Sequence, residues 1–154
     1  MKSLRLLSMI PFLFAAACSS RAHLAPPQGF AELAKNDTYS FRATSASGVV
    51  IAARTEANDP KGNLDFWTSA LDYKLQKSGY HRVGEPEKVA SSAGAVGKTI
   101  HFEIDRGGRP HEYWVTVFVI DDKVVVVEAA GDKAFFDAGT KKQIAEAVRS
   151  VKLG

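Results

Sequence analysis

Residues 112–130 have the sequence EYWVTVFVIDDKVVVVEAA, and this stretch decides the fold. Two runs rich in β-branched and aromatic residues flank the Asp121-Asp122 pair, a pattern typical of two strands joined by a turn. The first run, from Glu112 to Ile120, is apolar at successive positions and therefore on both faces of a strand. Such a strand lies inside a sheet. The stretch thus predicts two strands, of which the first is central.

The sequence before this stretch predicts further strands. Residues 99–105 alternate, with Ile100 and Phe102 on one face and His101 on the other. The Gly107-Gly108 pair predicts the turn that follows. Three more strands are predicted over residues 39–44, 49–55 and 81–90.

Two helices are predicted from helical periodicity. Asn63 and Gly79 bound the first, over residues 64–78, as an N-cap and as a residue suited to the left-handed conformation that ends a helix. Its apolar stripe consists of Leu64, Trp67, Leu71 and Leu75. Thr140 and Gln143 fit a capping box, which predicts the start of the second helix. Its apolar stripe consists of Ile144, Val148 and Val151.

The order of these elements is hairpin, helix, strand meander, helix. It predicts an α+β fold in which an antiparallel sheet of about six strands is packed by two helices. Pro86 interrupts the strand over 81–90 and confines it to an edge, because proline cannot donate to a strand ladder.

The N-terminus has the features of an export signal. Lys2 and Arg5 are followed by an apolar run that ends in Ala15-Ala16-Ala17. The run from Leu6 to Ala17 has 12 residues, whereas a helix needs about 20 to cross a bilayer. We therefore expect residues 1–17 to be a signal peptide rather than a permanent membrane anchor.

Cys18 follows the three alanines and is the only cysteine of the chain. This arrangement resembles the lipobox of bacterial lipoproteins, although Ala15 stands where the family usually has leucine. The resemblance implies acyl chains on Cys18 and, because Ser19 rather than aspartate follows it, an outer-membrane anchor facing the periplasm. The alternative is an ordinary signal peptide cut near Ala17 that leaves a free thiol.

Removal of residues 1–17 leaves 137 residues, the size of one domain. Residues 18–27 end in two prolines and are predicted to form a lipidated tether, and residues 28–154 a single α/β domain. The 137 residues carry 18 basic and 17 acidic side chains with no run of like charge, which argues against nucleic acid as a partner.

Few residues suggest chemistry, and the sequence indicates no cofactor, no metal site and no catalytic group. His101 and Glu103 share a strand face with His111 just across a turn, which leaves a less favoured enzymatic hypothesis open. Trp67 and Trp114 are predicted to pack in the core. Adjacent Phe135 and Phe136 cannot easily point the same way, so they are the predicted site of a contact patch.

Three stretches resemble the PsbP/DcrB-like family, which includes extrinsic photosystem subunits and small bacterial lipoproteins. They are Pro27-Gln28-Gly29-Phe30, Leu64-Asp65-Phe66-Trp67, and the closing segment from Val124 through Phe135-Phe136-Asp137 to Val151. The resemblance covers about residues 27–154. It implies an α/β sandwich and roles in binding and assembly more than in catalysis.

These observations predict a lipid-anchored periplasmic binding or accessory protein of the cell envelope, without catalysis, which contacts the membrane through Cys18 and an unidentified envelope protein. Two alternatives remain. One is a carrier of a small apolar ligand, with a cavity under the helix over 64–78. The other is a hydrolase-type enzyme that uses His101, Glu103 and His111.

Overall fold

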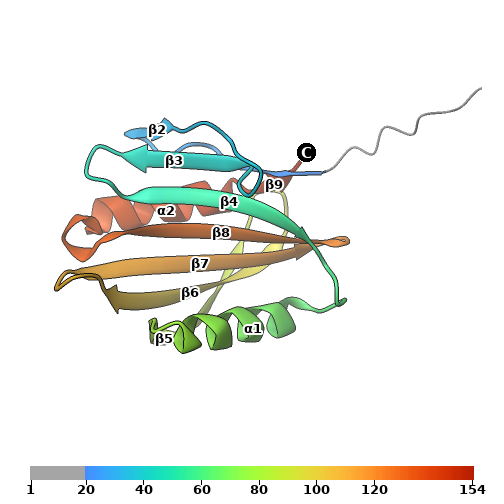
Figure 1. The fold of residues 1–154 in the computed structure, drawn as a ribbon. Helices are drawn as coiled ribbons and strands as arrows, with labels where there is room; N and C mark the ends of the chain where they lie inside the picture. Colours follow the sequence, from blue (N-terminus) through green and yellow to red (C-terminus); the bar gives the residue numbers. More distant parts are fainter. Residues whose placement is uncertain (1–19) are drawn as a thin grey trace, which may run out of the picture.

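A seven-stranded antiparallel sheet dominates the computed structural model, which describes residues 20–154 (Figure 1). Its strand order is β2-β3-β4-β8-β7-β6-β5. The strands are β2 (Phe30–Glu32), β3 (Phe41–Ser45), β4 (Val50–Ala57), β5 (His81–Ala90), β6 (Val96–Asp105), β7 (Pro110–Ile120) and β8 (Lys123–Asp132). The predicted α+β fold and the meander around residues 112–130 are confirmed, and β7 has a neighbour on both sides.

Two helices pack on opposite faces of this sheet, each over a different half. Helix α1 (Leu64–Lys77) contacts β5, β6 and β7, whereas α2 (Ala138–Arg149) shares its core with β3, β4 and β8. In Figure 1, α1 lies in front of the sheet at its lower edge, and α2 lies behind the upper strands. Half of each sheet face is therefore left without a helix.

Alternation along the strands builds a separate core on each face. Under α1, the stripe of Leu64, Trp67, Leu71 and Leu75 packs on Val115, Val117, Val124 and Val126. Under α2, the helix residues Ile144, Ala147 and Val148 pack with the intervening strand residues Phe118, Val125, Val127 and Ala129. Each fully buried valine or isoleucine contributes about 1.5–3 kcal/mol, so both helices are held mainly by these contacts.

The sequence correctly predicted the limits of α1. The side chain of Asn63 accepts a hydrogen bond from the backbone N–H of Phe66 at 2.9 Å, which satisfies one of the free donors of the first turn. Gly79 follows the helix with a φ of 88°, a conformation that residues with a Cβ rarely adopt.

The predicted capping box of α2 is wrong. The helix begins at Ala138, and its N-cap is Asp137, whose carboxylate accepts from the backbone N–H of Thr140 at 2.8 Å. Thr140 is therefore inside the first turn. An aspartate three residues earlier caps the same backbone donors at least as well as threonine does, so the helix starts there.

The beginning of the described chain belongs to the domain. β1 (Ala22–His23) pairs with β9 (Lys152–Leu153), and Arg21 and Gly154 exchange two backbone hydrogen bonds of 2.9 and 3.1 Å. Ala22 and Leu24 are buried in the core under α2. The tether predicted over 18–27 is therefore wrong from Arg21 onward, because this segment finds its partners in residues far away in the sequence.

The prediction for β5 is confirmed, since it forms an edge of the sheet and its register with β6 shifts between Val83 and Glu87. Pro86 lies within this irregularity, where no ladder hydrogen bond is required of it. The sheet has seven strands rather than about six because the three-residue β2 adds to the other edge.

Candidate binding surfaces

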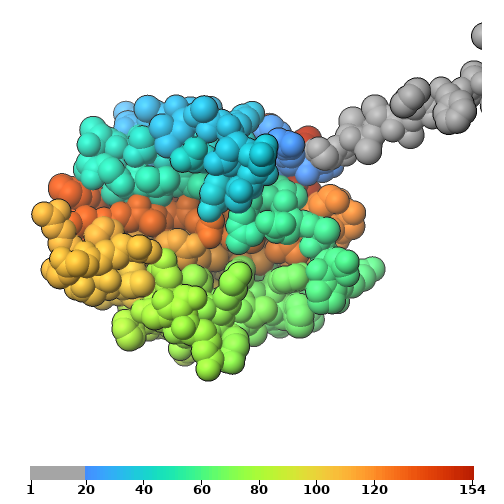
Figure 2. Space-filling view, viewed as in Figure 1, coloured from blue at the N-terminus to red at the C-terminus, as the bar shows by residue number. Residues whose placement is uncertain are grey.

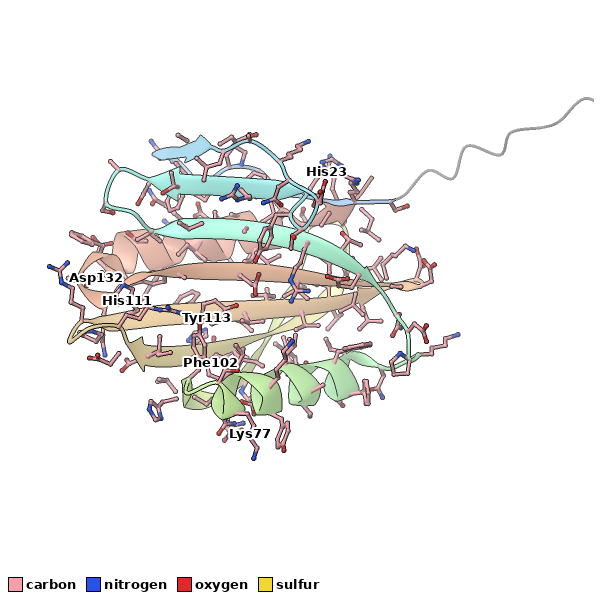
Figure 3. The ribbon with its side chains drawn as sticks, in the orientation of Figure 1. His23, Lys77, Phe102, His111, Tyr113 and Asp132 are labelled. Carbon is pink, nitrogen blue, oxygen red and sulfur yellow. The ribbon has the colours of Figure 1, made fainter. Side chains whose placement is uncertain are left out.

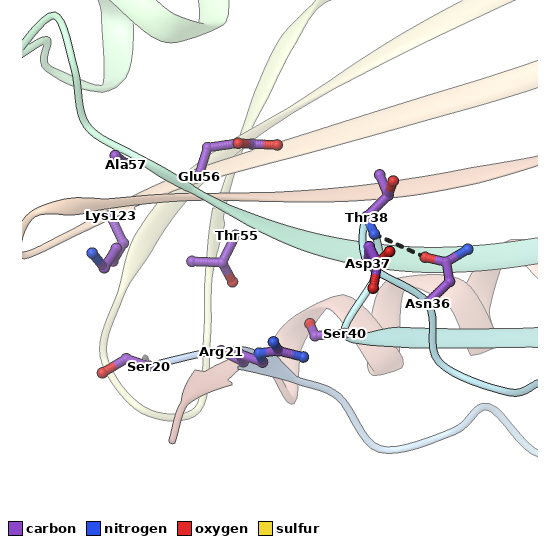
Figure 4. A pocket seen from close by; sticks show the side chains of 10 residues that line it. All are labelled: Ser20, Arg21, Asn36, Asp37, Thr38, Ser40, Thr55, Glu56, Ala57 and Lys123. Carbon is purple, nitrogen blue, oxygen red and sulfur yellow. Dashed lines mark hydrogen bonds between the residues drawn. The ribbon is translucent and has the colours of Figure 1, made fainter. Parts of the chain in front are cut away.

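The expected signal peptide and Cys18 lie outside the described residues. The first described residues, Ser20 and Arg21, line a polar pocket of about 240 Å³ at the end of the sheet where the chain enters the domain (Figure 4). Asp37, Glu56 and Lys123 also line it, and the backbone N–H of Thr38 donates to Asn36 Oδ1 nearby at 3.0 Å. No helix within residues 20–154 is long and apolar enough to span a bilayer.

The predicted contact patch is reduced to one residue. The ring of Phe136 is only 3% exposed and lies 5.9 Å from the Trp114 ring in the core under α2. Phe135, in the short helical turn η1 (Lys133–Phe135), is 47% exposed. Phe136 is therefore a core residue and no part of a patch, because successive residues of a tight turn point in different directions.

The structure does not bring His101, Glu103 and His111 together. The register pairs His111 with Ile104 and His101 with Trp114, so the two histidines lie on opposite faces of the sheet. His111 lies beside Tyr113 on the α1 side (Figure 3). Glu103 forms an ion pair with Lys133 at 2.5 Å. In residues 20–154, no group of three His, Cys, Asp or Glu side chains could hold a metal ion.

His101 and Trp114 form the floor of a cleft on the α2 side. Their rings stack at 4.2 Å with an angle of 3° between the planes, and the cleft of about 180 Å³ continues to Thr99, Thr116 and the α2 residue Arg149. Burial lowers the pKa of His101 and Lys141 adds to this effect, whereas Glu87 and Glu112 oppose it. The imidazole is therefore neutral at pH 7.

A carboxylate supports the Trp114 side of this cleft. Glu112 is 7% exposed, accepts a hydrogen bond from Trp114 Nε1 at 3.1 Å and pairs with Lys141 Nζ at 2.9 Å. Because both oxygens of Glu112 have partners, the indole is held in one orientation. The cleft offers a fixed aromatic surface rather than a free acid or base.

Trp67 packs in the core under α1, as predicted. Its Nε1 donates a hydrogen bond to Asn58 Oδ1 at 2.7 Å. A hollow of about 200 Å³ lies at the side of α1, lined by Trp67, Leu71 and Val126 together with charged residues such as Arg54. The prediction of an apolar cavity under α1 is wrong, because the stripe of α1 packs on Val115, Val117, Val124 and Val126 and fills that space. The hollow lies beside the helix instead.

Sequence reasoning missed a polar cluster on the half of the α1-side face that α1 leaves open. The hydroxyl of Tyr113 donates to Glu128 Oε1, and Arg54 Nε lies 3.6 Å from Glu128 Oε2. Burial raises the pKa of Tyr113, as does the negative charge of Glu128, and the same two causes act on Tyr39. The sequence feature that could have revealed this cluster is Glu128, the single acidic residue in the apolar run VVVVEAA, because acidic side chains are rarely buried without a partner.

No protein-family model and no curated protein matches this chain. Solved structures share its fold. The cyanobacterial PsbP (CyanoP) of Synechocystis sp. PCC 6803 superposes with a TM-score of 0.62 at 10% identity, over 96% of this chain and 99% of that chain. A protein of unknown function from Pseudomonas aeruginosa gives a TM-score of 0.56 at 10% identity, over 88% and 85% of the two chains. The expected PsbP-like fold is thereby confirmed, and identity this low concerns the fold alone.

Proposed function

We propose that this chain is a lipid-anchored protein of the bacterial cell envelope that works by binding a partner. The N-terminal signal pattern and Cys18 support the anchor. The observation that carries the proposal is the pairing of Arg21 with Gly154, because it starts the folded domain three residues after Cys18. Three residues span at most about 11 Å, so a lipid on Cys18 would hold the domain against the membrane surface.

An anchor at Cys18 would give the two ends of the sheet different surroundings. β8 has ten residues and runs from the end that holds Arg21 to the end that holds Phe135, a distance of about 30 Å (Figure 1). With the Arg21 end at the membrane, exposed Phe135 would face away from it, toward the periplasm in a Gram-negative cell. An exposed aromatic ring is of a type enriched in protein interfaces, which suits an envelope protein as partner.

The anchor is tested with the full-length chain beside a Cys18→Ala variant, by mass spectrometry of the N-terminal peptide and by membrane fractionation. We expect acyl chains and outer-membrane sedimentation for the wild type alone. Equal solubility of both chains, with the same unmodified N-terminus, would refute the anchor.

The binding role is tested by placing a photoreactive phenylalanine analogue at position 135 in the cells that encode the protein. We expect one discrete crosslinked product that disappears in the Cys18→Ala background. Position 73 is the matched control, because Tyr73 is 65% exposed on the outer side of α1. Products that are equal at both positions, or absent at 135, would contradict the proposed contact.

The hollow beside α1 supports a carrier of a small apolar ligand as the second candidate function. Ala70 lines this hollow, so Ala70→Phe would fill it without removing a core contact. A carrier predicts saturable binding of 1-naphthol by the wild type and its loss in Ala70→Phe, measured by Trp67 fluorescence. Unchanged fluorescence of the wild type would reject this role.

A further inference from the structure

The turn between β5 and β6, residues 90–96, is an exposed part of the surface that carries no charge; we call it the hairpin tip. The nine residues between Lys88 and Lys98 are VASSAGAVG, whereas 24% of the whole chain is charged. Five of the seven tip residues are exposed, among them Val96 with 57% of its surface accessible. Such a surface can approach lipid without the cost of removing a charge from water.

Hydrogen bonds hold the hairpin tip beside the beginning of the described chain. The backbone N–H of Ser92 donates to the carbonyl of Arg149, the last residue of α2, at 2.7 Å. The hydroxyl of the next residue, Ser150, accepts from the backbone N–H of Ala25 at 2.7 Å. In Figure 1 the yellow turn lies by β9, and Figure 2 shows the blue first residues against the red C-terminus at this end of the molecule. The tip and the segment that follows Cys18 are therefore held by neighbouring residues at one helix end.

Three exposed basic residues lie at the same end of the molecule as the hairpin tip. Lys88 precedes the tip on β5, the Arg149 carbonyl contacts it, and Lys152 lies in β9. Among residues 20–154 none of these three side chains forms an ion pair, whereas Lys98 pairs with Asp65 at 2.6 Å. The surroundings of the tip therefore carry positive charge, which an anionic lipid surface attracts.

We propose that the hairpin tip is a second membrane contact, which lies in the headgroup region of an anionic bilayer beside the lipid on Cys18. This contact presupposes the proposed anchor. The chain between Cys18 and Arg21 spans at most about 11 Å, so it keeps the tip close to the lipid surface. At the resulting high effective concentration even a weak contact is occupied. Val96 and the uncharged turn face the acyl boundary, and the three basic side chains reach the phosphates.

The first test places an environment-sensitive dye on the acylated full-length chain in vesicles of phosphatidylethanolamine and phosphatidylglycerol. Acylation blocks Cys18, so the only free thiol is the one that Ala93→Cys introduces in the tip. Ala46→Cys is the matched control, because Ala46 lies in the exposed and equally uncharged turn between β3 and β4, at the opposite end of the sheet. We expect emission at shorter wavelength, and quenching by brominated lipid, at position 93 only.

Mass spectrometry of the same samples distinguishes a failure of this contact from a failure of the anchor. A chain that carries no acyl groups refutes the anchor and the contact together. An acylated chain whose dye gives the same emission and the same quenching at positions 93 and 46 leaves the anchor in place and overturns the contact.

The second test changes the chemistry of the tip while the dye stays at position 93. Val96→Asp should abolish the spectral shift by placing a charge in the tip, whereas Val83→Asp, at a valine of β5 that is 49% exposed, should leave it unchanged. Lys88→Gln should lower the ratio of docked to undocked chains about fivefold, the usual effect of one basic residue at an anionic surface. Lys142→Gln, at the other end of α2, should not lower it. Circular dichroism identifies variants that fail to fold, and an undiminished shift in folded Val96→Asp overturns the proposal.

Discussion

The stacked pair of His101 and Trp114 makes stability depend on pH. Burial lowers the pKa of His101 below its ordinary value of 6.5, so the folded protein binds this proton less tightly than the unfolded chain does. The free energy of unfolding that His101 contributes is therefore complete above pH 6.5 and decreases as the pH falls below that value. We expect His101→Phe, which keeps an aromatic ring on Trp114, to reduce the loss of stability between pH 7 and 5, measured by urea unfolding.

The matched control for this prediction is His81→Phe, because His81 is exposed at the start of edge strand β5. The loss of stability between pH 7 and 5 should be smaller in His101→Phe than in His81→Phe. A His101→Phe protein that loses as much stability on acidification as the wild type would contradict the assignment.

At single residues, the sequence predicted which side chains are polar but not which of them meet. Periodicity correctly put His101 and Glu103 on one face of β6. The face of His111 depends on the register that the turn over 106–109 sets, and a shift of one residue reverses it. The contact of Tyr113 with Glu128 depends in the same way on the register of β7 with β8, which the turn at Asp121 and Asp122 sets.

The start of α2 gives a prediction about a whole element. The Asp137 carboxylate accepts from the N–H of Thr140, and this hydrogen bond lowers the pKa of Asp137. We expect Asp137→Ala to lower the free energy of unfolding by about 1 kcal/mol, the usual effect of a lost N-cap, and Thr140→Ala to change it little. Thermal unfolding at pH 7 compares the two variants. If Thr140→Ala lowers the free energy of unfolding more than Asp137→Ala does, Thr140 is the N-cap, as the sequence predicted.

Elements were predictable from sequence where they carry a long periodic pattern. α1, α2 and β6 have such patterns, β7 and β8 are continuous apolar runs, and the order of these elements sufficed to predict the fold class. β1, β2 and β9 have two or three residues each, too few for a period. β1 forms only by pairing with β9, and the paired residues Ala22 and Leu153 are 131 positions apart in the sequence. Their existence depends on tertiary contacts rather than on local preference.

At the scale of the molecule, the position of the first residues decides how the domain would sit on a membrane. Leu24 is 9% exposed and belongs to the core under α2, although the sequence predicted a tether there. If the segment is part of the fold, Leu24→Ala should lower the free energy of unfolding by about 2 kcal/mol or more, because it leaves a cavity. If the segment were a free tether, the substitution would have no effect.

Chemical unfolding of Leu24→Ala beside His23→Ala measures this difference, since exposed His23 shares the segment but contributes little burial. A loss confined to Leu24→Ala means that the fold begins at the residues that pair Arg21 with Gly154. The reach from Cys18 is then at most about 11 Å, so a lipid on Cys18 would hold the domain close to the membrane surface. If the two variants are equally stable, the segment is a free tether. The domain could then lie up to about 30 Å from Cys18, and the orientation of Phe135 would not be fixed.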